Sequence, residues 1–163
     1  VNQSFPDKPI LFTEGTVEAF STDKYQSWPN AERYGFSMIR DFNRGTVGWT
    51  DWNLLLDQTG GPNHVSNFCF APIHGDTSTG ELIYTPTYYY IGHFSKFVGP
   101  DSVRISTSVS RNVVLATSFL NPDGTMATIV MNKSNDSINY SFFLNDRQVD
   151  LTIPPRAMQT LVY

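Results

Sequence analysis

Residues 9–15 read Pro-Ile-Leu-Phe-Thr-Glu-Gly and contain the pattern that decides the fold. From Pro9 to Thr13 the run is short and apolar, and Glu14 and Gly15 end it. Such a run is typical of a strand that is buried on both faces of a parallel sheet. We therefore predict a buried parallel strand over residues 9–13, with Glu14 projecting from its carboxyl end.

The residues that follow this strand predict further α/β units. Pro29 suits the first turn of an amphipathic helix and Gly45 suits its end. A second strand is expected over residues 46–52 and another helix over residues 88–97. The order strand, helix, strand, helix indicates right-handed parallel α/β units. The apolar positions of the two helices are Ala31, Tyr34, Met38, Ile39 and Phe42 in the first, and Tyr90, Ile91, Phe94 and Phe97 in the second.

The second part of the chain has a different pattern. After Gly99 and Pro100 the apolar residues alternate with polar ones, and turn residues separate the runs. Asn121-Pro122-Asp123-Gly124 is one such turn, since Pro and Gly both favour turns. We predict one domain over residues 1–99 and an antiparallel β-sandwich over residues 100–163. The six expected strands cover residues 103–107, 113–120, 125–131, 140–144, 149–153 and 158–162.

Composition and charge exclude several classes of partner. The 163 residues are 40% hydrophobic and 14% aromatic, which favours a folded core over disorder. With 11 Lys and Arg against 15 Asp and Glu, there is no basic surface to hold a nucleic acid or an anionic membrane. Cys69 is the single cysteine, so an intramolecular disulfide is excluded, and its Phe neighbours favour a buried inert thiol. The apolar runs are too short for stable membrane insertion.

The first residues give a hint about the extent of the chain. Val-Asn-Gln-Ser-Phe-Pro, residues 1–6, has neither the charged start nor the apolar run of a signal peptide, and there is no initiating Met. We therefore expect the chain to be cut from a longer protein.

Glu14 is the sharpest candidate for chemistry. The carboxyl ends of parallel strands are where α/β barrels and open sheets place their catalytic groups. A carboxylate at this position could be a nucleophile, a general base or a metal ligand. The alternative is a surface Glu that caps a helix or forms a salt bridge.

The end of the second strand has the composition of a sugar site. Trp49 and Trp52 alternate with Thr50, Asp51 and Asn53. Indole rings stack on the C–H faces of pyranoses, and hydroxyl groups need polar partners. Alternation along the strand favours Trp49 in the core and Trp52 facing the opening.

Residues 56–79 are too long for a plain connection and are a candidate functional loop. Within it, residues 60–68 lack the ending of a phosphate-binding loop and are better suited to line a carbohydrate. The three histidines have no paired spacing that favours metal binding. Asp76 with Glu81 could bind calcium, or could be solvated turn residues. The histidines are His64, His74 and His93.

Four segments of the chain strongly resemble glycoside hydrolase family 30, above all its glucosylceramidase-like and bacterial endo-β-1,6-glucanase branches. The likeness runs in register from about Pro9 to Tyr163. The segments are Phe12-Thr13-Glu14-Gly15, Gly48-Trp49-Thr50-Asp51-Trp52-Asn53, Gly60-Gly61-Pro62-Asn63 and Gly92-His93-Phe94-Ser95-Lys96-Phe97.

The resemblance implies a role for several residues. Glu14 would be the catalytic nucleophile at the end of the seventh strand of a (β/α)8 barrel, and Trp52, after the eighth strand, would line the glycone pocket. Asn67 and Phe68 would lie at the rim of that pocket. Thr16 stands where the family often has Cys, and so would alter the shape of the pocket. The second catalytic carboxylic acid would lie upstream, in an N-terminal barrel segment that this chain lacks.

These implications define the expected function. We expect part of a retaining hydrolase of β-glucosidic bonds in a carbohydrate or glycolipid, with no cofactor or metal, and with the missing barrel segment as a required partner. A secreted, periplasmic or, in an animal, lysosomal location is expected. The alternatives are a non-catalytic carbohydrate-binding fragment and a purely structural fragment.

Overall fold

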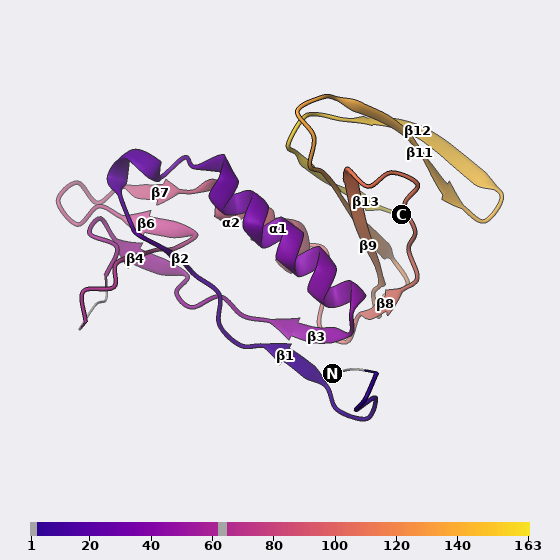
Figure 1. Cartoon of the computed structure of the whole chain (residues 1–163), viewed down its shortest axis with the longest axis horizontal. Helices are drawn as coiled ribbons and strands as arrows, with labels where there is room; N and C mark the ends of the chain where they lie inside the picture. Colours follow the sequence, from indigo (N-terminus) through magenta and orange to yellow (C-terminus); the bar gives the residue numbers. More distant parts are fainter. Residues whose placement is uncertain (1–2, 62–64) are drawn as a thin grey trace. The chain divides into compact units, whose positions relative to one another are not determined.

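The computed structural model describes residues 3–61 and 65–163. The chain forms two compact units, Val1–Gly92 and His93–Tyr163, and the division falls within the helix α2 (Pro86–Ser95). Figure 1 shows both units, coloured along the chain from indigo at the N-terminus to yellow at the C-terminus. The predicted boundary at residues 99 and 100 remains a prediction. Neither helix in the described residues combines the length and the apolar character needed to cross a membrane.

The first unit is built on one parallel strand pair and a helix. The strand β1 (Ile10–Phe12) pairs in parallel with β3 (Thr46–Trp49), and α1 (Trp28–Asn43) connects them, as Figure 1 shows. Gly45 has a φ of +96°, a conformation that glycine adopts without strain, and it ends the helix just before β3. The predicted strand, helix and parallel second strand are therefore confirmed.

Two details of this strand pair differ from the prediction. The second strand ends at Trp49 and not at residue 52. Leu11 is 62% exposed, so the expected burial of the first strand on both faces is wrong, and Val47 in β3 is also 64% exposed. The physical reason is that β1 and β3 pair only with each other among the described residues, and their outward side chains have no covering layer.

The helix α1 turns one apolar side inward. Its first turn contains Pro29, where a missing backbone N–H costs nothing. The buried side follows the helical spacing that the sequence predicts. It consists of Ala31, Tyr34, Gly35, Met38 and Ile39.

Residues 56–79, predicted to be one long functional loop, contain short strands. They contain parts of a three-stranded sheet, in which β6 (Ile73–Gly75) lies between the parallel β4 (Leu55–Asp57) and the antiparallel β7 (Leu82–Tyr84). Another two-stranded pairing joins β2 (Val17–Glu18) to β5 (Cys69–Phe70). A single 3₁₀ turn, η1 (Thr22–Lys24), precedes α1.

His74, in the middle of β6, joins two neighbouring backbone segments by hydrogen bonds. The side chain is fully buried. Its Nε2 accepts a hydrogen bond from the backbone N–H of Ala71 at 3.0 Å, so the ring is protonated at Nδ1, which donates to the carbonyl of Asp57 at 2.9 Å. Burial lowers the pKa of His74 and keeps the ring neutral, so both hydrogen bonds persist.

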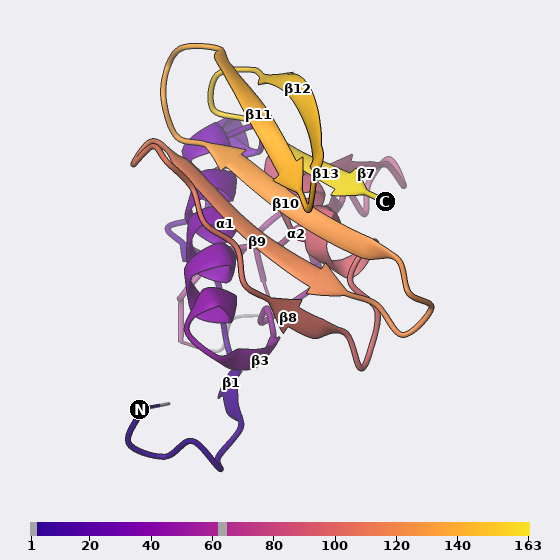
Figure 2. The same cartoon turned by 90° about the vertical axis from the view of Figure 1, so that its right-hand side faces the viewer.

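The second unit is an antiparallel β-sheet with an added hairpin. The strand order in the sheet is β13-β10-β9-β8, and Figure 2 shows this sheet with the hairpin β11–β12. All six predicted strands are present. They are β8 (Val103–Ile105), β9 (Val114–Leu120), β10 (Met126–Asn132), β11 (Ile138–Leu144), β12 (Arg147–Ile153) and β13 (Met158–Val162).

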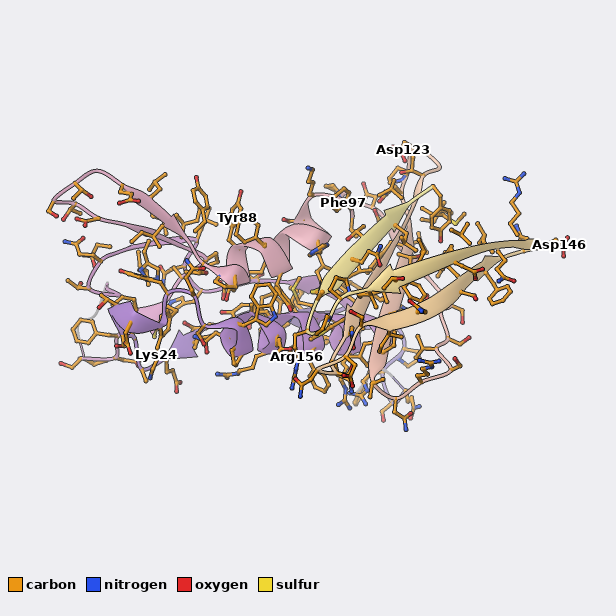
Figure 3. The ribbon with its side chains drawn as sticks, turned by 90° about the horizontal axis from the view of Figure 1, so that it is seen from above. Lys24, Tyr88, Phe97, Asp123, Asp146 and Arg156 are labelled. Atoms are coloured by element: carbon orange, nitrogen blue, oxygen red, sulfur yellow. The ribbon has the colours of Figure 1, made fainter. Side chains whose placement is uncertain are left out.

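The hairpin and the sheet share an apolar core. Side chains from β9 and β10 pack with Ile138 and Ile153, which face each other at the open end of the hairpin. The side chains contributed by the sheet are Val114, Ala116 and Val130. Figure 3 labels Asp146 at the turn of this hairpin and Asp123 in the β9–β10 turn. Gly124, with φ +86°, gives that second turn the shape that its sequence predicts.

Asn132 fastens the hairpin to the end of β10. Its side chain is fully buried, and its amide nitrogen donates to the carbonyls of Asp136 at 2.7 Å and Pro154 at 2.8 Å. Its Oδ1 accepts from the backbone N–H of Ser134 at 2.9 Å. One side chain therefore satisfies the backbone at both ends of the hairpin.

Replacing Asn132 should destabilise the second unit. Asn132→Ala leaves buried backbone groups without partners, so we expect the free energy of unfolding to fall by about 2–4 kcal/mol. Chemical denaturation measures the change. Asn139→Ala, at an exposed asparagine of β11, is the control and should cost less than about 0.5 kcal/mol. Equal effects of the two variants would contradict this role of Asn132.

Replacing His74 should change both stability and its dependence on pH. His74→Phe keeps an aromatic ring but removes two hydrogen bonds, so we expect a loss of about 2–4 kcal/mol near neutral pH. Because the folded pKa lies below the unfolded value, the stability that His74 contributes is present above the unfolded pKa and is lost as pH falls toward the folded one. The difference in Tm between wild type and variant should therefore become smaller as the pH falls from about 7 to about 5. A constant difference would contradict the coupling to protonation.

Candidate active site

Glu14 lies where the sequence places it, two residues after the end of β1. Its side chain is exposed, and it forms no hydrogen bond or ion pair with any other residue that the structure describes. A carboxylate in this state is open to a ligand and is not used as a helix cap or a salt-bridge partner. The surface alternatives considered for Glu14 are therefore not observed among these residues.

Backbone hydrogen bonds bring the end of β3 beside Glu14. The N–H of Thr50 donates to the carbonyl of Phe12 at 2.9 Å, and the N–H of Trp52 donates to the carbonyl of Gly15 at 2.8 Å. These bonds continue the parallel pairing of β1 and β3 past the regular strands. The backbone of Trp52 therefore lies beside the segment that carries the candidate nucleophile.

The two tryptophans of β3 and its extension have different surroundings. Trp49 stacks on Phe12 with a centroid distance of 4.6 Å and a plane angle of 10°, and its Nε1 donates to Asp41 Oδ2 at 3.3 Å. A Cβ at Gly15 would lie 2.7 Å from Trp49 Cη2, so only glycine fits there. Trp52, in contrast, is 42% exposed. This is the division between core and surface that strand alternation predicts.

Asp51 points to the helix side and not to the open side. Its Oδ1 accepts a hydrogen bond from the Tyr34 hydroxyl of α1 at 2.9 Å. Burial raises the pKa of Asp51 to about 6, against the lowering effect of hydrogen bonds from Tyr34 and from the Trp52 backbone. Burial, and then the Asp51 charge, raise the pKa of Tyr34, so this phenol stays protonated. The position of Asp51 among Trp49, Thr50, Trp52 and Asn53 favours it as a sugar partner, and the structure gives it the buried Tyr34 as partner instead.

The β2–β5 pairing brings the remaining candidates to the same segment. Thr16 immediately precedes β2, and the pairing sets Glu18 opposite Cys69. The N–H of Phe20 donates to the carbonyl of Phe68 at 3.1 Å. Asn67 and Phe68 are exposed and directly precede β5, so the structure joins their segment to the one that follows Glu14.

The other candidate residues either lie outside the described part of the chain or have structural roles of their own. His64, Pro62 and Asn63 lie outside the described residues. Cys69 is buried, with Sγ 3.4 Å from the carbonyl of Asn67. Asp76 caps the β6–β7 turn by accepting from the N–H of Ser78 at 2.8 Å.

His93 is likewise part of the structure of its own unit. Its Nδ1 is 2.8 Å from Thr160 Oγ1, and burial lowers its pKa. Over residues 3–61 and 65–163, no three His, Cys, Asp or Glu side chains gather in a way that could hold a metal ion. Backbone pairing thus joins the segment of Glu14 to those of four other candidates, Thr16, Trp52, Asn67 and Phe68.

Sequence reasoning missed the hydrogen-bond partners of two side chains, Asp51 and His74. The Tyr34–Asp51 hydrogen bond joins residues on different elements, and the only local signal is that Asp51 shares its strand side with Trp49. His74 was considered only as a metal ligand, whereas its ring joins the backbone of Asp57, at the end of β4, to the backbone of Ala71, between β5 and β6. A buried histidine within an apolar strand was the signal that could have indicated a structural role.

Comparisons with known proteins agree with this arrangement. The TIM-barrel domain model of glycosyl hydrolase family 30 matches residues 1–98, and the β-sandwich domain model of the same family matches residues 101–161. The chain is 34% identical to putative glucosylceramidase 4 of Caenorhabditis elegans over 99% of its length, and 38% identical to lysosomal acid glucosylceramidase of Mus musculus over 82%.

Solved structures give the same result. SrfJ from Salmonella typhimurium superposes with a TM-score of 0.94 at 36% identity over 99% of this chain, and an endo-β-1,6-glucanase superposes with a TM-score of 0.82 at 27% identity over 98%. The chain spans about a third of these relatives: 33% and 27% of the two glucosylceramidases and 36% of each solved chain. The fold is thus part of a TIM barrel followed by a β-sandwich, and the chain belongs to glycosyl hydrolase family 30.

Proposed function

We propose that the full-length protein hydrolyses β-glucosidic bonds with retention of configuration and that Glu14 is its nucleophile. One observation carries the proposal: Glu14, just after the carboxyl end of β1, is exposed and has no partner among the residues that the structure describes, and its segment is bonded to that of the exposed Trp52. An exposed carboxylate and an exposed indole on neighbouring segments suit attack on a stacked sugar. The family assignment supplies the reaction class.

The reaction would proceed in two displacements. A Glu14 carboxylate oxygen attacks the anomeric carbon, the bond from that carbon to the glycosidic oxygen breaks, and a second carboxylic acid gives its proton to the leaving oxygen. Water, deprotonated by that same second group, then displaces Glu14 and releases the sugar. We propose that the second group comes from a part of the protein beyond this chain, about 5 Å from Glu14 in the assembled site.

The remaining candidates would shape the glycone pocket. Trp52 would stack on a sugar face, Asn67 and Phe68 would lie at the rim, and Thr16 would lie beside the nucleophile. The C. elegans and mouse relatives are named as glucosylceramidases and one structural neighbour as an endo-β-1,6-glucanase. We therefore propose a glucosylceramide-like lipid or a β-1,6-glucan as substrate.

We further propose that the protein works outside the cytosol, in a secreted, periplasmic or lysosomal setting. The support is that one relative is named as lysosomal. Fractionation of the source cells, followed by detection of the protein, tests this location.

Glu14→Gln should abolish turnover in the full-length protein. The amide has almost the same size but cannot form the glycosyl ester, so we expect kcat to fall by about 10³-fold or more while Tm stays the same. Hydrolysis of an aryl β-glucoside measures kcat, and a fluorinated β-glucoside should label the peptide that contains Glu14. Glu81→Gln, at an exposed glutamate, is the control. Activity of Glu14→Gln within about tenfold of wild type would remove Glu14 from this role.

Trp52→Ala should weaken binding of the glycone. The lost stacking area predicts a cost of about 1–3 kcal/mol, or roughly a 5- to 150-fold increase in KM. Trp28, which is 46% exposed, provides the matched control, and Trp28→Ala should leave KM unchanged. A stable Trp52→Ala protein with wild-type KM and kcat would place Trp52 outside the site.

A further inference from the structure

Asp51 lies between the two backbone hydrogen bonds that fix the site. Thr50, before it, donates to Phe12, and Trp52, after it, donates to Gly15. Both of its neighbours are therefore tied to the segment that carries Glu14. The Asp51 side chain extends to α1, where the Tyr34 hydroxyl holds it at 2.9 Å.

Asp51 is half-buried, and the burial of one of its carboxylate oxygens is unfavourable for stability. Among the residues that the structure describes, its Oδ2 is buried without a hydrogen-bond partner. A buried acceptor without a partner is unfavourable, and an apolar residue of similar size avoids that cost. Residues that break such rules are concentrated at functional sites.

Attachment of the helix to the strand does not depend on this pair alone. The Trp49 ring packs edge-on against Tyr34 at 5.4 Å, and Trp49 Nε1 also donates to Asp41 of α1. These contacts join the same two elements within the regular strand. The Tyr34–Asp51 hydrogen bond adds an attachment to α1 after the regular strand has ended at Trp49 and directly before Trp52.

We propose that Asp51, held by Tyr34, is a positioning residue that sets the Trp52 ring against the sugar next to Glu14. The inference rests on the proposed function, because it gives the Tyr34–Asp51 pair a role in the sugar site proposed around Glu14. Asp51 acts through Trp52 and touches no reacting atom. The hydrogen bond from Tyr34, and not the Asp51 charge, is the feature that matters.

The experiment uses the full-length protein and measures KM and kcat on an aryl β-glucoside, with Tm for each variant. Tyr34→Phe and Asp51→Ala both remove the hydrogen bond and should raise KM by about five- to tenfold, with a smaller change in kcat. Asp51→Asn keeps the size and the acceptor oxygen, so its KM should stay within about twofold of wild type. Asp41→Asn changes the other carboxylate that joins α1 and β3, and should leave KM unchanged.

The decisive measurement combines these variants with Trp52→Ala. If the pair acts through Trp52, Tyr34→Phe adds no further increase in KM once the indole is gone. An equal increase in both backgrounds would overturn the inference, as would wild-type KM in folded Tyr34→Phe and Asp51→Ala. A loss of Tm without a change in KM would assign the pair to stability alone.

Failure of the proposed function gives a different result. In that case wild type itself does not hydrolyse β-glucosides, and the same variants are compared by calorimetric binding of an alkyl β-glucoside. Weaker binding by Tyr34→Phe than by Asp41→Asn still supports the positioning role. Equal binding, or no binding by wild type, overturns it.

Discussion

The parallel register of β1 and β3 is the constraint on which the candidate site depends. Phe12 is paired with Trp49, and this match stacks their rings and sets the Glu14 segment beside the Trp52 segment. A slip of one residue would move every side chain of β3 to the other side of the strand. Trp52 would then face the helix, and the core would lose the ring that fills the space above Gly15.

Local patterns were enough to predict most of the fold. The two helices, the parallel strand pair and the six strands of the second unit all follow from short-range periodicity and turn residues. The strands β2 and β4 to β7, of two or three residues each, were missed because they stand within turn-rich sequence that shows only short apolar runs and no sustained alternation. Their partners lie up to about 50 residues away, as in the pair Val17 and Phe70, and no local period reports such pairing.

The candidate site was also predictable only in part from local sequence patterns. Strand alternation predicted the different surroundings of Trp49 and Trp52, because it is a property of one strand. The partner of Asp51 could not be predicted, because Tyr34 approaches it from another element through tertiary packing. The exposure of Leu11 was likewise beyond the sequence pattern, since burial depends on which neighbours a strand has. The roles of Glu14, Thr16, Trp52, Asn67 and Phe68 stay predictions.

The burial of Asn132 has a consequence for the biosynthesis of the protein. Asn132-Lys133-Ser134 is an acceptor triplet for N-linked glycans. The amide nitrogen that would carry the glycan already donates two hydrogen bonds inside the folded second unit, where no space exists for a sugar. Transfer of a glycan to Asn132 and folding of the β-sandwich therefore exclude each other. In a eukaryotic secretory host, chains glycosylated at Asn132 and correctly folded chains would form two separate populations.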